Sequence, residues 1–415
     1  MDLGENRISE LPDSLLHHIL CFLPTKCAIR TSILSRRWRY LYTSIPILDF
    51  RKWRSHTSTS TLEGYRLEHE RFRNFLDRIL NLHDMPNLLK FYLHCDRHFN
   101  ESRVNAWISS VIRRKVEELD LSLFGEYNLF PPSLFTCESL TILELKMDVE
   151  YVLHLPQSIS FPRLKILRLT DITFMDENLT QQLFSNCPVL EELSISSCLW
   201  INMKVLCILA PALKCLFFNS PSEDGSDTLD NCEVKIYAPS LLSLRYYEGV
   251  ATNYFLHSFS SLVNADIDLM FLDDSLLTRV KIGYSASKLL GGLSNVKHLT
   301  LSGDTFKALS FAYDTLINLP TFYNLVHLEV GSMFPCSTNR TLLEFLHIVP
   351  NLESLLFTDG FNQGIYDGDD GWAINLMAPC LLLHLKSVEI RQFSGHSREL
   401  SVICRTKLLS SVLEF

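Results

Sequence analysis

The stretch CPVLEELSI, residues 187–195, shows the pattern that decides the fold. One apolar residue is followed three positions later by a second and two positions later by a third: Leu190, Leu193 and Ile195. The last two are two apart, so both side chains point to the same face of a β-strand. Proline precedes the pattern, where it ends the incoming segment without disturbing the strand.

The same pattern recurs along most of the chain. Clear copies begin at Leu140, Leu164, Leu213, Leu241, Val296, Leu325 and Leu352, and weaker ones at Leu88, Val116, Leu262 and Leu385. Successive copies start 27 residues apart on average, with single intervals from 21 to 34. This mean is typical of leucine-rich repeats, whose units close no core alone and must stack. We therefore predict an α/β fold over residues 86–379: a repeat solenoid with a curved parallel sheet and outer helices and loops.

The residue between the last two apolar positions of each copy points to the opposite, concave face of the predicted sheet. Aromatic residues and arginines on this face are candidates for binding a target, because these residue types are enriched at binding hot spots. The candidates are Arg168, Phe217 and Arg245 at this position, together with Asn219, Tyr247 and Asp268 at the next outward positions. Scattered exposed aromatics on an irregular solenoid are the alternative interpretation.

Residues 8–50 follow a different pattern. Apolar residues between Leu11 and Leu23 recur every three or four positions, the period of an amphipathic helix. Pro12 suits the start of this helix and Pro24 its end. A second helix is predicted from about Thr25, followed by a basic and aromatic turn. A core of about forty residues is marginal alone, so this module is expected to lean on a partner or on the next domain.

This N-terminal module, residues 5–50, resembles the F-box family. The resemblance rests on Leu11-Pro12, on the run LLHHILCFLP, and on LSRRWRYLY with Trp38. It implies docking on a Skp-type adaptor and, through that adaptor, on a cullin-based ubiquitin ligase. The positions that the family uses for its own core or for the adaptor are Leu11, Pro12, Leu15, Ile19, Leu20, Leu23, Leu34 and Trp38. Which of them face the adaptor stays open, and a helical cap on the solenoid's first edge is the alternative.

Two further segments flank the repeats. Residues 51–85 are polar and then helical, and we interpret them as a connector. Residues 380–415 resemble the FBD segment of plant F-box proteins, on the strand LKSVEI, the Phe393-Ser394-Gly395 turn and the final VLEF, with Trp372 and Pro379-Cys380-Leu381 ahead of it. The family segment continues with another strand, so this copy looks truncated.

Composition narrows the function. A net charge of −9 disfavours a broad nucleic-acid surface. The N-terminus is polar, and the most apolar stretch, residues 199–218, is interrupted by charges and proline, so no membrane association is expected. Twelve cysteines without a CxxC pair indicate a reduced protein of the nucleus or cytoplasm.

No catalytic, cofactor or metal site is expected. The HCDRH motif with His94, Cys95 and His98 lacks a second ligand pair, and the loop at residues 367–371 departs from a calcium loop. Phosphate-loop, dinucleotide and GxSxG motifs are absent from the sequence; GYSAS at Gly283 lacks the final glycine. The resemblance thus predicts a non-catalytic substrate-recognition subunit of a Skp–cullin–F-box ligase, whose target the sequence does not identify. A Skp-binding scaffold and, more remotely, a hydrolase on a repeat scaffold are the alternatives.

Overall fold

The structure is a computed structural model with two compact units. It describes residues 8, 11–51, 62–95, 99–124, 130–220, 229–257, 259–271, 276–312, 318–331, 339–358 and 384–393. The N-terminal unit comprises residues 1–173 and 186–188, and the C-terminal unit residues 174–185 and 189–415.

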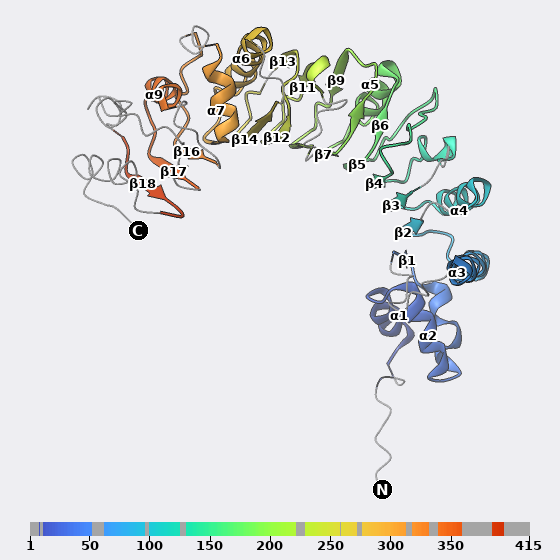
Figure 1. Ribbon diagram of the computed structural model, residues 1–415. Helices are drawn as coiled ribbons and strands as arrows, with labels where there is room; N and C mark the ends of the chain where they lie inside the picture. Colours follow the sequence, from blue (N-terminus) through green and yellow to red (C-terminus); the bar gives the residue numbers. More distant parts are fainter. Residues whose placement is uncertain are drawn as a thin grey trace. The chain divides into compact units, whose positions relative to one another are not determined.

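The N-terminal unit begins with a small helical module (Figure 1, blue). Pro12 and Pro24 directly precede its two α-helices, where a missing N–H costs nothing because the first turn has no internal acceptor for it. The elements are α1 (Asp13–Cys21), α2 (Thr25–Arg30) and the 3₁₀ helices η2 (Thr31–Ile33) and η3 (Arg37–Ser44). Its core consists of Leu16, Leu20, Ala28, Trp38, Leu41 and Ile45. The predicted basic turn is thus a 3₁₀ helix that contributes Trp38 and Leu41 to this core.

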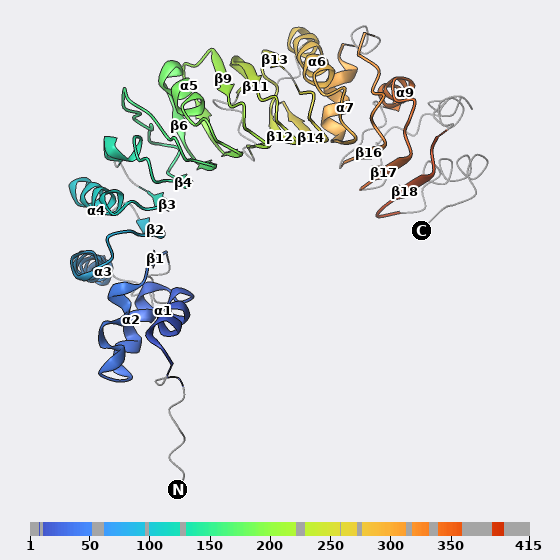
Figure 2. The same ribbon diagram turned by 180° about the vertical axis from the view of Figure 1, so that it is seen from behind.

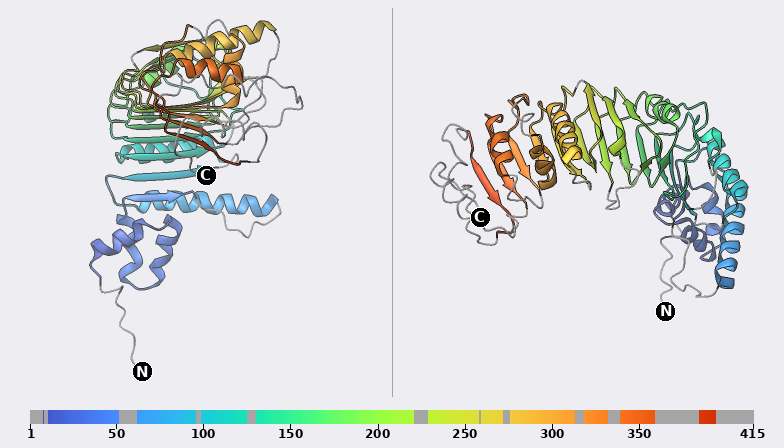
Figure 3. Two further views of the ribbon diagram at one scale, coloured as in Figure 1. Left: turned by 90° about the vertical axis from the view of Figure 1, so that its left-hand side faces the viewer. Right: turned by 45° about the horizontal axis from the view of Figure 1, so that its top comes forward.

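A parallel sheet follows in the same unit. Its strands pair in chain order: β1 (Ile47–Phe50), β2 (Lys90–Cys95), β3 (Glu118–Leu123), β4 (Ile142–Lys146) and β5 (Ile166–Thr170). The first repeat leucines are in register, so that Leu119, Leu143 and Leu167 lie side by side and fully buried. Helices α3 (Leu62–Leu82) and α4 (Glu101–Arg113) stack one after the other along the strands, and the 3₁₀ helix η4 (Pro132–Leu134) follows them (Figures 1 and 3). Because β1 pairs with β2, β1 and α3 form a strand–helix unit like the one made by β2 and α4.

The C-terminal unit repeats this arrangement. Its main sheet is parallel, in the order β7 (Glu192–Ser196), β10 (Cys215–Asn219), β12 (Ser243–Gly249), β14 (Asn264–Met270), β15 (His298–Leu301), β16 (His327–Val330), β17 (Ser354–Phe357) and β18 (Ser387–Ile390). Helices lie on one side of these strands (Figures 1 and 2): α5 (Glu177–Ser185), α6 (Leu276–Gly291), α7 (Gly303–Ser310) and α9 (Asn339–His347). The other side is called the open face here. The prediction of a helical module followed by stacked leucine-rich repeats is confirmed.

A second sheet in the C-terminal unit was not predicted. Between α5 and α6 the outer layer consists of three parallel strands, β9 (Val205–Leu209), β11 (Glu233–Tyr237) and β13 (Asn253–His257). The 3₁₀ helix η5 (Leu229–Asn231) and the short strands β6 (Thr173–Phe174) and β8 (Leu199–Trp200) complete the elements. Aromatic rings fill the space between the sheets, with Tyr246 edge-on to Tyr254 at 5.8 Å. The outer layer of this unit is thus made of strands between α5 and α6 and of helices from α6 onward.

The predicted FBD-like segment is described only in part. Its strand LKSVEI contains β18, and Phe393 follows with an exposed ring. Trp372, Pro379-Cys380-Leu381 and residues 394–415 lie outside the described residues. In the ranges that are described, no helix combines the length and the apolar character needed to cross a bilayer.

Candidate functional site

The helical module carries large apolar side chains that remain exposed in the described chain. Leu15, Ile19, Phe22 and Leu23 lie one turn apart on α1 and at its end, and all four side chains are exposed. Two more exposed apolar side chains, Ile33 and Leu34, follow α2. We call these six residues the apolar surface of the module. Large exposed apolar patches are typical of interaction sites, so this surface is the candidate site of the module.

The structure divides the eight F-box positions into two groups. Leu20 and Trp38 are buried in the module's core, and Leu11 packs against that core. Pro12, Leu15, Ile19, Leu23 and Leu34 are exposed. Phe22 and Ile33, which are 76% and 87% exposed, were missed. Phe22 continues the spacing of Leu15 and Ile19 along the helix, so helical periodicity could have found it.

α1 is apolar on two sides, and this explains the division. Leu16 and Leu20 form the stripe that covers Trp38 and Ala28, while the neighbouring stripe has no core left to cover. An ion pair between Arg37 and Asp13 (2.6 Å) ties η3 to the start of α1. The apolar surface is therefore held on a fixed scaffold by the inner stripe.

On the open face of the N-terminal unit, the charged side chains form ion pairs with one another. The Arg51 guanidinium lies 4.0 Å from the Tyr92 ring centroid and forms ion pairs with Asp49 (2.9 Å) and Asp120 (3.4 Å). Arg168, a predicted target-binding residue, is bound by Glu144 on the adjacent strand. Burial, together with the charge of Glu144, raises the pKa of Asp120 to about 6. The charged groups here satisfy one another across the strands.

The other five predicted target-binding residues gather on the open face of the C-terminal unit. In the register of the strands, Phe217 is beside Arg245, and Asn219 is beside Tyr247. The next strand, β14, places Asp266 beside Arg245 and Asp268 beside Tyr247. The structure thus brings these five together on β10, β12 and β14, and it places Arg168 in the other unit.

Aromatic and acidic side chains contact one another in this cluster. The rings of Phe217 and Tyr247 meet edge-on, with centroids 6.1 Å apart. The Tyr247 hydroxyl donates a hydrogen bond to the Asp266 carboxylate. Burial raises the pKa of Asp266, while the Tyr247 hydrogen bond and the Arg245 charge oppose this shift. We call Phe217, Tyr247, Asp266 and Asp268 the aromatic–acidic patch. The repeat pattern places Asp266 on this face, but Asp266 is not among the predicted target-binding residues.

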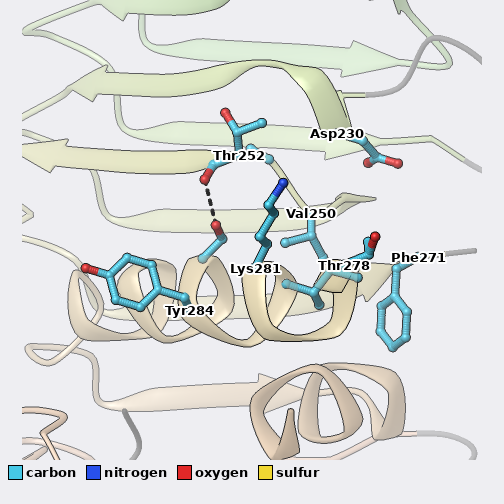
Figure 4. A pocket seen from close by; sticks show the side chains of 10 residues that line it. Asp230, Val250, Thr252, Phe271, Thr278, Lys281 and Tyr284 are labelled. Carbon is cyan, nitrogen blue, oxygen red and sulfur yellow. Dashed lines mark hydrogen bonds between the residues drawn. The ribbon is translucent and has the colours of Figure 1, made fainter. Parts of the chain in front are cut away.

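A pocket of about 200 Å³ lies elsewhere in the C-terminal unit, between α6 and the segment that follows β12 (Figure 4). Val250, Ala251 and Ile282 line it, and Lys281 reaches from α6 toward the strands. The Ser285 hydroxyl donates a hydrogen bond to the Thr252 carbonyl (2.7 Å). Sites for drug-sized ligands measure roughly 300–1,000 Å³, so this pocket fits only a small fragment.

The structure describes parts of the HCDRH and GYSAS motifs, which were excluded as sites on the basis of the sequence. His94 is exposed at the end of β2 beside the buried Cys95, whereas His98 and residues 367–371 lie outside the described residues. GYSAS lies within α6. Across the described ranges no group of three or more His, Cys, Asp or Glu side chains could hold a metal ion.

A helical module with an exposed apolar stripe, joined to leucine-rich repeats, defines an F-box protein. The F-box domain family matches residues 8–47, and the LRR repeats of the FBD-associated F-box protein At5g56370 match residues 104–254. F-box/LRR-repeat protein At3g59190 of Arabidopsis thaliana is 33% identical over 377 residues, covering 86% of this chain and 94% of the relative. FBD-associated F-box protein At4g10400 of the same plant is 30% identical over 401 residues, covering 95% and 88%. The chain belongs to the F-box/LRR-repeat family, and the resemblance inferred from its sequence is confirmed.

Proposed function

We propose that this chain is the target-binding subunit of a Skp–cullin–F-box ubiquitin ligase. The observation that carries the proposal is the apolar surface of the F-box module. Leu15 and Ile19 remain 48% and 40% exposed although a complete core lies beneath them. Fully burying a side chain of this size contributes roughly 1.5–3 kcal/mol, so a Skp-type adaptor that covers several of them gains most of its affinity here.

Ubiquitin transfer by such a complex requires proximity from this chain and no acid or base. The F-box module would attach to the adaptor, which joins the cullin, while the repeats hold a target protein. Holding two molecules on one chain makes the second encounter intramolecular, with effective concentrations reaching the millimolar range. We place this activity in the nucleus or cytoplasm, where such ligases act.

A matched pair of substitutions tests the adaptor interface. Leu15→Asp puts a charge on the apolar surface, and Leu67→Asp puts the same charge on α3, where Leu67 is also 48% exposed. We expect Leu15→Asp to weaken binding of a purified Skp-type adaptor at least about tenfold, because the carboxylate would be buried without a partner. Leu67→Asp should bind like the unmodified chain. Circular dichroism of both variants controls for folding.

Ubiquitin transfer separates the ligase from the scaffold alternative. Proteins captured by proximity labelling should accumulate when the chain is removed, and the reconstituted ligase should modify them. If the adaptor binds but no captured protein is modified or stabilised, the chain is a scaffold. If the unmodified chain fails to bind the adaptor, the ligase proposal is wrong.

A further inference from the structure

The open faces of the two units differ in how their charges are balanced. In the N-terminal unit each carboxylate on the strands has a cationic partner: Asp49 and Asp120 pair with Arg51, Glu118 with Lys90, and Glu144 with Arg168. In the C-terminal unit Glu389 pairs with Arg391 at 2.8 Å. For Asp266, Asp268 and Glu329, however, no Lys or Arg side chain of the described chain lies within ion-pairing distance.

These carboxylates also lie close enough to repel one another. Asp266 and Asp268 are two apart on β14, and their side chains leave the same face roughly 7 Å apart. Asp304, in the first turn of α7, is affected by the charge of Asp268, and burial together with that charge raises its pKa. A cation placed on this face would relieve the repulsion.

Aromatic rings lie beside the carboxylates. Phe217 is partly exposed, and its ring contacts that of Tyr247, whose hydroxyl holds Asp266 in place. An aromatic ring next to a carboxylate favours lysine or arginine, because the ring face attracts the cation and the carboxylate pairs with it. Phosphate groups would be repelled, which disfavours nucleic acid.

We propose that the open face of the C-terminal unit binds an extended basic segment of the target protein, with lysine or arginine entering the aromatic–acidic patch. This inference rests on the proposed function, since it names the class of target that the repeats hold. Glu329 lies on β16, two strands beyond β14, or roughly 10 Å at the usual strand spacing. A segment crossing the strands, with cationic side chains about 7 Å apart at every second residue, can reach both places.

Removal of Arg245 is expected to affect binding in the direction opposite to removal of a carboxylate. Its side chain is exposed between Phe217 and Asp266, and it partly offsets the negative charge of the patch. Removing this cation should therefore strengthen binding of a basic segment. Removing a carboxylate should weaken it.

Synthetic peptides test this with the full chain, both alone and together with its Skp-type adaptor. The probe is a fluorescein-labelled peptide of about ten residues with arginine alternating with serine, long enough to cross several strands. We expect it to bind by fluorescence anisotropy, and the same peptide with glutamate in place of arginine not to bind. Asp266→Asn combined with Asp268→Asn should weaken binding at least tenfold, and Arg245→Gln should strengthen it about threefold. Glu233→Gln, on the outer strand β11, removes one charge from the same unit and should change nothing.

Each outcome bears on one proposal at a time. Equal binding of both peptides, loss of binding with Arg245→Gln, or tighter binding of an oligouridylate RNA would overturn the inference. If the arginine peptide fails to bind while the adaptor binds and Leu15→Asp abolishes that contact, the inference fails and the proposed function stands. If the peptide binds but the adaptor does not, the proposed function fails and the basic-segment site stands.

Discussion

Glu248 is a carboxyl group inside the C-terminal unit, with only 2% of its surface exposed. It follows Leu244 and Tyr246 at inward-facing positions of β12. Its carboxylate accepts hydrogen bonds from the Gly249 N–H (3.1 Å) and from the Ser220 hydroxyl. Burial nevertheless raises its pKa to about 7, because these hydrogen bonds compensate only part of the lost hydration.

This shift makes the stability of the C-terminal unit depend on pH. The pKa of Glu248 rises from 4.5 in the unfolded chain to about 7 in the fold. Between these values the folded state keeps a proton that the unfolded state has lost, so the free energy of unfolding falls as pH rises and levels off above about 7. The contribution is on the order of 3 kcal/mol. We expect Glu248→Gln to lose this dependence and to melt at a higher temperature than the unmodified chain at pH 8.

Calorimetry at about pH 5 and pH 8 measures the effect. Glu233→Gln, with its carboxylate partly exposed on β11, serves as the control and should keep the original slope. An unmodified chain with the same melting temperature at both values would contradict the ionisation assigned to Glu248.

At this scale, the sequence predicts which face a side chain lies on but not which residues it contacts. Alternation within each repeat correctly placed Arg168 and Arg245 on the open face. It gave no sign that Arg168 is bound by Glu144 while Arg245 has an exposed side chain, because pairing depends on rotamers and neighbouring strands. Glu248 was also missed, since a pattern of apolar residues does not show a polar residue at an inward position.

At the scale of elements, α6 and α7 pack closely at one glycine. A Cβ atom on Gly283 would lie 2.6 Å from both the Cβ and the backbone nitrogen of Ala312, which follows α7. Gly291, at the end of the same helix, differs: its Cβ would meet Leu319 and Pro320 at 3.8 Å, an ordinary contact. Gly283 is thus required by packing, although glycine weakens a helix by about 1 kcal/mol.

We expect alanine at these two positions to have opposite effects. Gly283→Ala should lower the free energy of unfolding by about 1–3 kcal/mol, since backbone must move to admit the methyl group. Gly291→Ala should be neutral or stabilise by up to about 1 kcal/mol, through helix propensity and a less flexible unfolded chain. Thermal melting of the two variants is the measurement. A Gly283→Ala chain as stable as Gly291→Ala would show that α6 does not pack so closely.

From β2 onward the strands of the main sheets could be predicted, whereas β1 and the outer sheet could not. Each predicted strand carries the apolar residues of a repeat at fixed spacing, so even the weak copy at Leu262 was found. β9, β11 and β13 lie in return segments that carry no such pattern. Short apolar runs such as VLCIL in β9 fit a strand or a buried helix turn equally well, and only packing against the neighbouring return segment decides.

At the scale of the whole molecule, the two proposed interaction surfaces differ in chemistry. The apolar surface of the F-box module consists of Leu15, Ile19 and the four other apolar residues that define it, none of which is charged. The open face of the C-terminal unit presents Asp266, Asp268 and Glu329. The chain's net charge of −9 adds a long-range attraction for basic partners. Association through the first surface depends on burial of apolar area, and association through the second depends on charge.

Salt should therefore separate the two contacts on one chain. The Debye length, over which salt screens charges, falls from roughly 14 Å at about 0.05 M salt to roughly 4 Å at about 0.5 M. This removes most of the attraction between partly exposed charges. We expect the dissociation constant of the arginine peptide to rise at least tenfold over this range, and that of the Skp-type adaptor to change less than about threefold, because apolar burial is not screened. Titrating both ligands against the same preparation measures this. An adaptor contact as sensitive to salt as the peptide contact would mean that charges, rather than the apolar stripe on α1, dominate the F-box interface.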